Sequence, residues 1–296
     1  MAAPLSAAAL LAALLAEGVT VTEVGRWRTH NRNTVGAWGP VNGSVVHHSV
    51  TRGTASTVAT CRDGYVGLPG PLCHGVIAKS GRVYLVGYGR TNHAGGGDPR
   101  VLDQVVAEDY GTRPTPPTRG NKDGVDGNAR FYGWECENLG DGKDPWPAAQ
   151  YDAIVRVQAA LCRAHGWSAK SVIGHLEWSS DKIDPRGFAM ADLRADVAER
   201  LTHPASWNPG SSTTTPSTTP SKEDPMAGMT REQIYDAVWR TDRMTPPEGR
   251  ATKDNPTWAA ESVLRDAASY ATRAEAAATR IEKALAEFTK LITKES

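Results

Sequence analysis

A segment rich in threonine, serine and proline divides this chain of 296 residues into two unequal parts. It extends from Trp207 to Pro225, contains four prolines and shows no periodic spacing of apolar residues. Such a composition favours an extended, semi-flexible linker and cannot supply a packed core. The sequence therefore predicts a first domain over residues 1–203, a linker over 204–225 and a separate region over 226–296.

The charge balance argues against a protein built mainly to bind nucleic acid. The chain has 33 basic and 33 acidic residues, whereas nucleic-acid-binding domains are usually basic. Apolar residues make up 40% of the chain and charged residues 22%, as in ordinary globular proteins. No run of about 18 consecutive apolar residues is present, so no stable membrane insertion is expected. Residues 2–17 predict an amphipathic helix rather than a secretory signal, because the first basic residue is Arg26.

Strand and helix signals alternate along the first domain. Runs rich in β-branched residues predict strands, while proline opens helices and glycine ends them. The expected elements are strands over 43–50, 131–138 and 171–174, a hairpin over 75–86 that turns at Ser80 and Gly81, and helices over 147–165 and 189–201. Interleaved strands and helices predict an α/β fold with a central sheet.

The region 226–296 has a different, helical pattern. Thr230 and Gln233 form a capping box before an apolar run. From Val263 to Leu291, apolar residues are spaced alternately by four and three, which is a heptad seam. The pattern predicts a coiled coil or a helical hairpin. Because many seam residues are alanine, we expect residues 256–294 to need a partner helix or to self-associate.

Cysteine usage does not indicate a disulfide scaffold or a thiolate metal site. The four cysteines are scattered and form no Cys-x-x-Cys motif. Buried thiols are the simplest interpretation. A disulfide between Cys61 and Cys73 is the alternative for a protein that works outside the cytoplasm.

Three residues could together hold a metal ion. His47 lies at the end of an expected strand, and His175 and Asp184 bound a single loop between another strand and a helix. Two imidazoles and one carboxylate form the three-ligand zinc arrangement that leaves a fourth position open. Spacing alone also fits ordinary polar residues at strand ends, so this interpretation stays open at the level of the residues.

Five ordered motifs strengthen the metal interpretation. They are the His-His pair within 44–51, the Cys-His pair within 71–77, Asn-His-Ala-Gly at 92–95, Gly-Trp-Glu within 132–138, and the Gly-His…Lys-x-Asp-Pro segment at 174–185. In this order they resemble the type 2 N-acetylmuramoyl-L-alanine amidases, relatives of peptidoglycan recognition proteins. Amidase domains of phage endolysins that attack actinobacterial walls look most similar. The resemblance covers roughly residues 20–202 and implies a central mixed β-sheet flanked by helices.

The resemblance implies roles for individual residues. His47, His175 and Asp184 match the family's zinc ligands. Glu135 matches its general base, and Lys182 matches the residue that stabilises the transition state. At two further matching positions, His74 and His93 are expected to contact substrate, with a purely structural role as the alternative.

The same resemblance implies a function. We expect a phage endolysin that hydrolyses the amide bond between N-acetylmuramic acid and L-alanine, made in the host cytoplasm without a signal peptide and released with the help of a holin. The expected cofactor is Zn²⁺ and the expected partner is peptidoglycan, which the region 226–296 could also bind. A non-catalytic peptidoglycan-binding module is the main alternative, and an inhibitor of a host enzyme is a third. Asp184 favours the enzyme, because non-enzymatic relatives typically lack the third, anionic or thiolate ligand.

Three details qualify the match. The loop between His175 and Lys182 looks one residue shorter than in many relatives, and Cys73 stands where some phage amidases carry a tyrosine. Since side chains alternate along a strand, His48 is expected to point away from His47. Glu137 is expected on the opposite side of its strand from Glu135.

Overall fold

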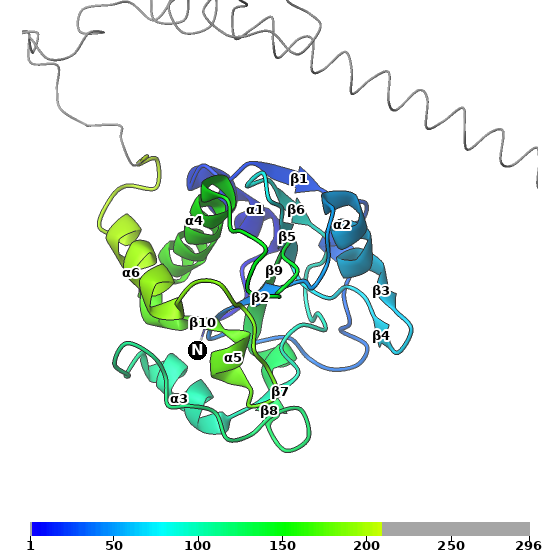
Figure 1. Cartoon of the computed structure of the whole chain (residues 1–296), viewed down its shortest axis with the longest axis vertical. Coiled ribbons are helices and arrows are strands. Elements are labelled where there is room, and N and C mark those ends of the chain that lie inside the picture. Colours follow the sequence, from blue (N-terminus) through cyan, green and yellow to red (C-terminus); the bar gives the residue numbers. More distant parts are fainter. Residues whose placement is uncertain (1, 209–296) are drawn as a thin grey trace, which may run out of the picture. The chain divides into compact units, whose positions relative to one another are not determined.

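The computed structural model describes residues 2–208 (Figure 1). The expected region 226–296, with its heptad seam, and most of the linker lie outside the described residues. The helices are α1 (Ala7–Ala16), α2 (Thr54–Asp63), α3 (Pro99–Ala107), α4 (Ala148–His165), α5 (His175–Trp178) and α6 (Met190–Leu201), with short 3-10 turns at Trp27–Thr29, Gly127–Ala129 and Ala169–Ser171. The strands are β1 (Val21–Glu23), β2 (Gly43–His48), β3 (Gly64–Tyr65), β4 (Leu68–Pro69), β5 (Gly75–Ile77), β6 (Val83–Leu85), β7 (Gly96–Gly97), β8 (Val125–Asp126), β9 (Phe131–Cys136) and β10 (Val172–Gly174).

A six-stranded mixed sheet organises the described residues. Its strand order is β1-β6-β5-β9-β2-β10. Strands β5, β9, β2 and β10 run parallel, β1 is parallel to β6, and β5 and β6 form an antiparallel hairpin. β2 lies between β9 and β10, so the carboxyl ends of three neighbouring parallel strands meet at one edge of the sheet. The expected α/β fold with a central mixed sheet is confirmed.

One face of the sheet is covered by helices α1, α4 and α6. Helix α4 packs against both α1 and α6, and Figure 1 shows α4 and α6 side by side beside the sheet. The largest apolar cluster joins Leu10 and Leu14 of α1 to Ile154 of α4 and to Val46 and Trp134 of the sheet. These five side chains are almost completely buried.

Local signals explain where the main helices of this face begin and end. The Ser6 side chain accepts a hydrogen bond from the amide of Ala9, which fixes the start of α1 at Ala7, later than the expected helix over 2–17. Helix α4 follows Pro147 and ends at Gly166, which adopts the left-handed conformation that glycine tolerates. The expected helices over 147–165 and 189–201 are confirmed to within one residue.

The opposite face carries a second apolar cluster and the candidate site. Val45, Phe131 and Ile173 of the sheet pack there with Val101 of α3 and Trp178 of α5. Helix α2 covers the neighbouring part of this face, where Cys61, Cys73 and Val76 form a third cluster. All four cysteines of the chain are buried, free thiols.

The remaining strand predictions are also confirmed. β2, β9 and β10 lie within the expected ranges, and the β5–β6 hairpin turns through Gly81, whose positive φ suits glycine.

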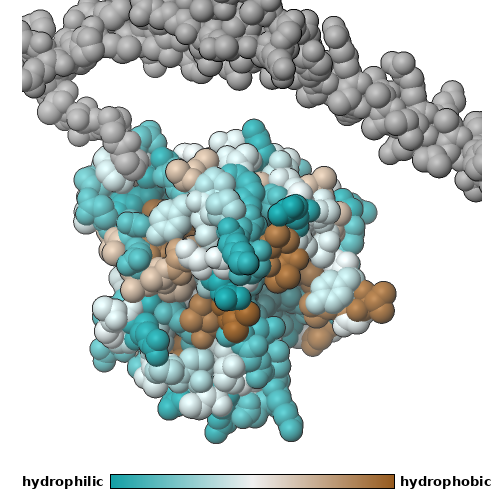
Figure 2. Space-filling model, in the orientation of Figure 1, coloured by the Kyte–Doolittle hydropathy of each residue, from teal (hydrophilic) through white to brown (hydrophobic). Residues whose placement is uncertain are grey.

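The small β3–β4 hairpin carries the exposed side chains of Tyr65 and Val66. Figure 2 shows an apolar patch on the side where Figure 1 places these two strands. Within residues 2–208, no helix is both long and apolar enough to cross a membrane.

Candidate metal centre and active site

Three candidate ligands converge at the carboxyl ends of β2 and β10. His47 is the fifth residue of β2, and His175 directly follows β10 as the first residue of α5. The two strands are parallel neighbours with Gly174 opposite Val46, which brings both rings to the same edge. Nδ1 of His47 lies 2.9 Å from Nδ1 of His175, and Oδ2 of Asp184 lies 3.0 and 3.1 Å from these two nitrogens.

The geometry of this cluster fits a tetrahedral zinc ion with one open position. The three atoms lie within 4.8 Å of one another. Their spacing approaches the roughly 3.3 Å expected for ligands about 2.0–2.1 Å from a tetrahedral zinc ion. Two imidazole nitrogens and one carboxylate oxygen that face each other are also the donor set of a three-ligand zinc site. The donor set and its geometry therefore fit zinc.

The protonation of the cluster supports the same conclusion. Burial, and then the charge on His175, lowers the pKa of His47 to about 4, so this ring is neutral at pH 7. Burial alone would raise the pKa of Asp184, but hydrogen bonds with the two imidazoles outweigh it and hold that pKa well below its ordinary value. A neutral imidazole beside an ionised carboxylate is the protonation state that metal binding needs.

A buried ion pair anchors α5, which carries His175. Arg194 of α6 donates to both carboxylate oxygens of Glu177, at 2.7 and 2.8 Å. Glu177 in turn accepts a hydrogen bond from the amide of Gly174, the last residue of β10. This pair ties the start of α5 to α6, so His175 is held by elements on both sides of it.

Glu135 lies beside the cluster on the neighbouring strand. β9 pairs with β2 so that Glu135 is directly opposite His47, and both side chains are on the same face. Its Oε2 atom is buried and has no hydrogen-bond partner among the described residues. Burial, and then the charge of Asp184, raises the pKa of Glu135 to about 8, against the opposing charge of Lys182. An unpaired carboxyl group with such a pKa is suited to exchange protons near neutral pH.

Lys182 lies on the loop that leads to Asp184. Its charge lowers the pKa of both Glu135 and His47, so this loop places the ammonium group near the cluster. The loop is fixed by Asp181, which accepts a hydrogen bond from the amide of Asn121. The neighbouring Ile183 is exposed, so the loop lies at the protein surface.

His74 and His93 both lie inside the protein. His74 has no exposed surface, and its two ring nitrogens bond to the amide of Gly133 and the carbonyl of Gly89. His93 lies against His47, with its Nδ1 atom 3.1 Å from Nε2 of that ring. Both residues therefore have internal roles. Their contact with substrate stays a prediction.

The two expectations from strand alternation have different outcomes. His48 points away from His47, and its Nδ1 accepts a hydrogen bond from the amide of Arg186. The expectation for Glu137 is wrong, because residues two apart on a strand share a face. Glu137 stays out of the cluster because its carboxylate accepts hydrogen bonds from the amide of Gly53 and the hydroxyl of Thr54, at the start of α2.

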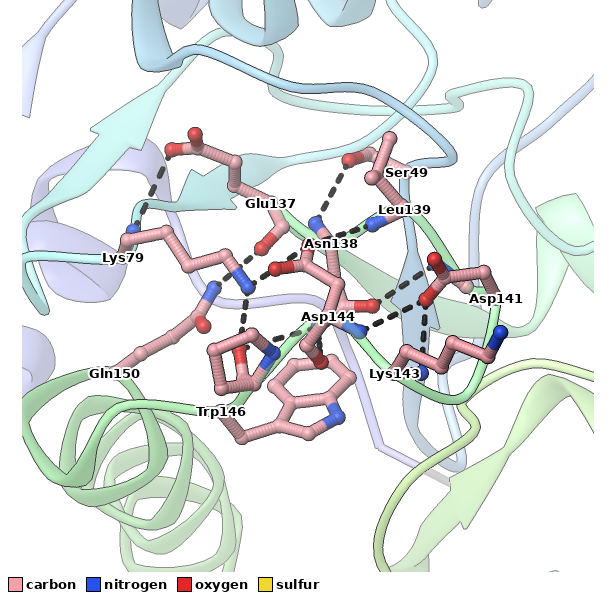
Figure 3. A network of polar contacts seen from close by, with 12 residues as sticks. Ser49, Lys79, Glu137, Asn138, Leu139, Asp141, Lys143, Asp144, Trp146 and Gln150 are labelled. Carbon is pink, nitrogen blue, oxygen red and sulfur yellow. Dashed lines mark hydrogen bonds and ion pairs between the residues drawn. The ribbon is translucent and has the colours of Figure 1, made fainter.

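The loop after β9 is held by a network of polar contacts (Figure 3). Asn138 donates to the carbonyl of Asp144, and Asp144 accepts from the amide of Leu139. Lys79 forms an ion pair with Asp144, while Gln150 of α4 donates to the carbonyl of Glu137. These bonds fix the chain directly after the strand that carries Glu135. No motif in the sequence predicts this network.

Comparison with known proteins decides the family. The model of the Amidase_2 family, described as N-acetylmuramoyl-L-alanine amidase, matches residues 37–187, just over half of the chain. The chain belongs to this amidase family. The matched range contains all seven residues that the motifs single out, and the resemblance found in the sequence is confirmed. No curated protein matches the chain.

Solved structures of amidases are similar to this amidase. The endolysin N-acetylmuramoyl-L-alanine amidase LysCS from Clostridium intestinale URNW is 18% identical, with a TM-score of 0.37, and the match covers 60% of this chain and 95% of that chain. LysC from the same organism is 18% identical, with a TM-score of 0.39 and coverage of 60% and 97%. A selenomethionine derivative of AmpD is 19% identical, with a TM-score of 0.36 and coverage of 60% and 94%.

Cys73 is not placed to replace a catalytic tyrosine in this amidase. It is completely buried beside Cys61. Burial, and then the contact with Cys61, raises the pKa of the Cys73 thiol well above its ordinary value. A neutral, inaccessible thiol is a poor acid or base, which leaves Glu135 as the candidate for proton transfer.

Proposed function

We propose that this amidase hydrolyses the bond between N-acetylmuramic acid and L-alanine in peptidoglycan with a zinc ion held by His47, His175 and Asp184. The main support is one juxtaposition. The three ligand atoms lie within 4.8 Å of one another, and the unpaired carboxyl group of Glu135 is directly across the strand pair from His47. When bound, zinc supplies a positive charge that polarises the scissile carbonyl and acidifies water.

Glu135 and Lys182 carry the remaining chemistry in this proposal. Glu135 takes a proton from the attacking water and delivers it to the amine of L-alanine as the carbon–nitrogen bond breaks. Lys182 favours the ionised form of Glu135, because its charge lowers the pKa of that group. The same ammonium group stabilises the negative charge that develops on the carbonyl oxygen.

We propose further that the enzyme acts as a phage endolysin during host lysis. The five ordered motifs support this assignment, as does a Thr/Ser/Pro linker that joins the amidase domain to a second region. In this proposal the second region binds the wall or associates chains through residues 256–294, and a separate holin releases the enzyme to the cell wall.

Digestion of purified peptidoglycan tests the reaction. The full chain should release stem peptides with a free L-alanine amine, detected by mass spectrometry. The products should disappear with a chelator and return with zinc. They should also be absent for Glu135→Gln but present for Glu199→Gln, a matched change at an exposed glutamate of α6. A wild-type protein that sediments with the wall and releases no such peptide would instead be a binding module.

A further inference from the structure

His93 lies directly behind the candidate ligand His47, on the side away from the metal cluster. Its Nδ1 is 3.1 Å from Nε2 of His47, and its own Nε2 is 3.2 Å from the carbonyl oxygen of Phe131. His93 as a whole is only 7% exposed. We propose that His93 is a positioning residue that fixes the tautomer and orientation of His47 for zinc binding, and that Gly133 is required because it makes room for His93. This inference rests on the zinc site of the proposed function.

The hydrogen-bond chain determines where each proton lies. A carbonyl oxygen only accepts, so Nε2 of His93 must carry a hydrogen. Nδ1 of the neutral His93 ring is then an acceptor, and Nε2 of His47 must donate to it. With a metal ion between the ligands, this chain of hydrogen bonds places the lone pair of His47 on Nδ1, the atom that faces His175 and Asp184. The carbonyl of Phe131 thus selects the ligand form of His47 through His93.

The second histidine ligand is fixed in the same way, without an intermediate ring. Nε2 of His175 lies 3.1 Å from the carbonyl oxygen of Ala94, which leaves Nδ1 free to bind a metal. His93 and Ala94 are consecutive residues, so one short segment orients both imidazoles. Asn128 holds this segment, because its side-chain oxygen accepts hydrogen bonds from the amides of His93, Ala94 and Gly95.

Gly133 is explained by the space that His93 occupies. A Cβ atom at this position would lie 2.3 Å from Cγ of His93, well inside the van der Waals limit. The backbone of Gly133 does not adopt the positive φ that would by itself favour glycine. The glycine of the Gly-Trp-Glu motif is therefore needed for the ring that holds His47, although it touches no ligand itself.

Ring-nitrogen NMR on the zinc-loaded wild-type full chain gives the first test. Two-dimensional ¹H–¹⁵N spectra distinguish the two neutral tautomers of each histidine. We expect His47 as the Nε2–H tautomer, with a proton bonded to His93. A dominant Nδ1–H tautomer of His47 would overturn the proposal, and this result requires neither a variant nor peptidoglycan.

Zinc affinity of full-length variants gives the second test, by competition with a chromophoric chelator. His93→Leu should weaken zinc binding by about 10–100-fold, the usual effect of losing the partner of a histidine ligand. His93→Gln should recover part of that loss, because its amide oxygen can accept from His47. His165→Leu, a matched change on the opposite face of the sheet that removes a bond to Tyr132, should leave the affinity within about twofold.

Gly133→Ala tests the steric requirement alone, because it reduces the space available to His93 and leaves every histidine in the chain. It should weaken zinc binding as much as His93→Leu does. Gly111→Ala is its control, since a Cβ at Gly111 meets no atom within 4 Å. Wild-type affinity in His93→Leu, or no recovery in His93→Gln, would overturn the proposal. A protein that passes these tests yet cleaves no peptidoglycan would refute the proposed function alone.

Discussion

Strands β2 and β9 present two different surfaces on alternate residues. On one face, Val46 and Trp134 are completely buried under α4 and contact mainly apolar side chains. On the other face, their chain neighbours His47 and Glu135 lie opposite each other at the candidate metal centre. Consecutive residues of each strand therefore alternate between apolar packing on one face and the candidate site on the other.

The difference lies in what each face requires of its neighbours. Apolar side chains need only close packing, which many combinations of residues can supply. On the polar face, each donor or acceptor atom needs its own partner that can form a hydrogen bond with it or bind it. His47 has one in His93, whereas Oε2 of Glu135 has no hydrogen-bond partner among the described residues. We expect substitutions on the two faces to separate stability from activity.

The largest expected effect follows from removing the anionic ligand. Asp184→Asn should lower the activity on peptidoglycan by more than about a thousandfold, because the site loses both a ligand and the charge that balances the metal. Zinc content after gel filtration should fall with it. His48→Ala is the control, since this ring is on the other face of β2 and bonds to Arg186 instead. Full zinc occupancy in Asp184→Asn would contradict the assignment.

Glu135→Gln should separate proton transfer from metal binding. The amide retains the size of the side chain but cannot act as a base, so the activity should fall by about 10²–10⁴-fold. Zinc content should be unchanged, in contrast to Asp184→Asn. The release of peptides with free L-alanine termini measures the first effect, and metal analysis measures the second. Activity within tenfold of the wild type would show that another group carries the proton.

Local patterns predicted the elements of both faces well. The β-branched run before His47, the turn at Ser80 and Gly81, and the boundaries of α4 are set by residues close in the chain. Contacts between residues far apart in the sequence were harder to predict. The contact between His93 and His47 joins residues 46 positions apart, and the motif resemblance marked both histidines without showing that they touch.

Two further residues show why the site was only partly predictable. Asn128 organises the segment 93–95 from a 3-10 turn that carries no recognisable motif. Gln158 is a polar residue at an apolar-face position of α4, yet it is completely buried, with no hydrogen-bond partner for its amide group among the described residues. Nothing in the structure explains this burial.

On the packing face, Val46→Ala should cost stability and leave the chemistry intact. Loss of two buried methyl groups should lower the free energy of unfolding by about 1.5–3 kcal/mol. Activity per folded molecule and zinc affinity should match the wild type, although the next residue is a candidate ligand. Chemical denaturation and chelator competition test the two statements. A tenfold loss of zinc affinity would show that the two faces are coupled through β2.

The pH dependence of the stability of the metal-free protein should reveal how much the burial of Glu135 lowers the free energy of unfolding. Its pKa is raised from 4.5 to about 8 in the folded protein, so between these pH values the unfolded chain loses a proton that the folded chain retains. Stability should therefore fall as the pH rises through this window. Glu135→Gln removes this dependence and should be more stable than the wild type at pH 8, but not at pH 4. Thermal unfolding in chelator measures the difference, and an equal difference at both pH values would contradict it.

The smallest effect is expected at the N-terminal helix, far from any chemistry. The Ser6 hydroxyl accepts the amide hydrogen of Ala9, one of the donors at the start of α1 that have no partner within the helix. Ser6→Ala should lower the free energy of unfolding by about 1 kcal/mol, because Leu10 and Leu14 still anchor α1 in the core. Activity should not change, since α1 packs with α4 on the face opposite the candidate site. If Ser6→Ala lowered the zinc affinity while the protein stayed folded, α1 would be coupled to the site, and the division between the two faces would not hold.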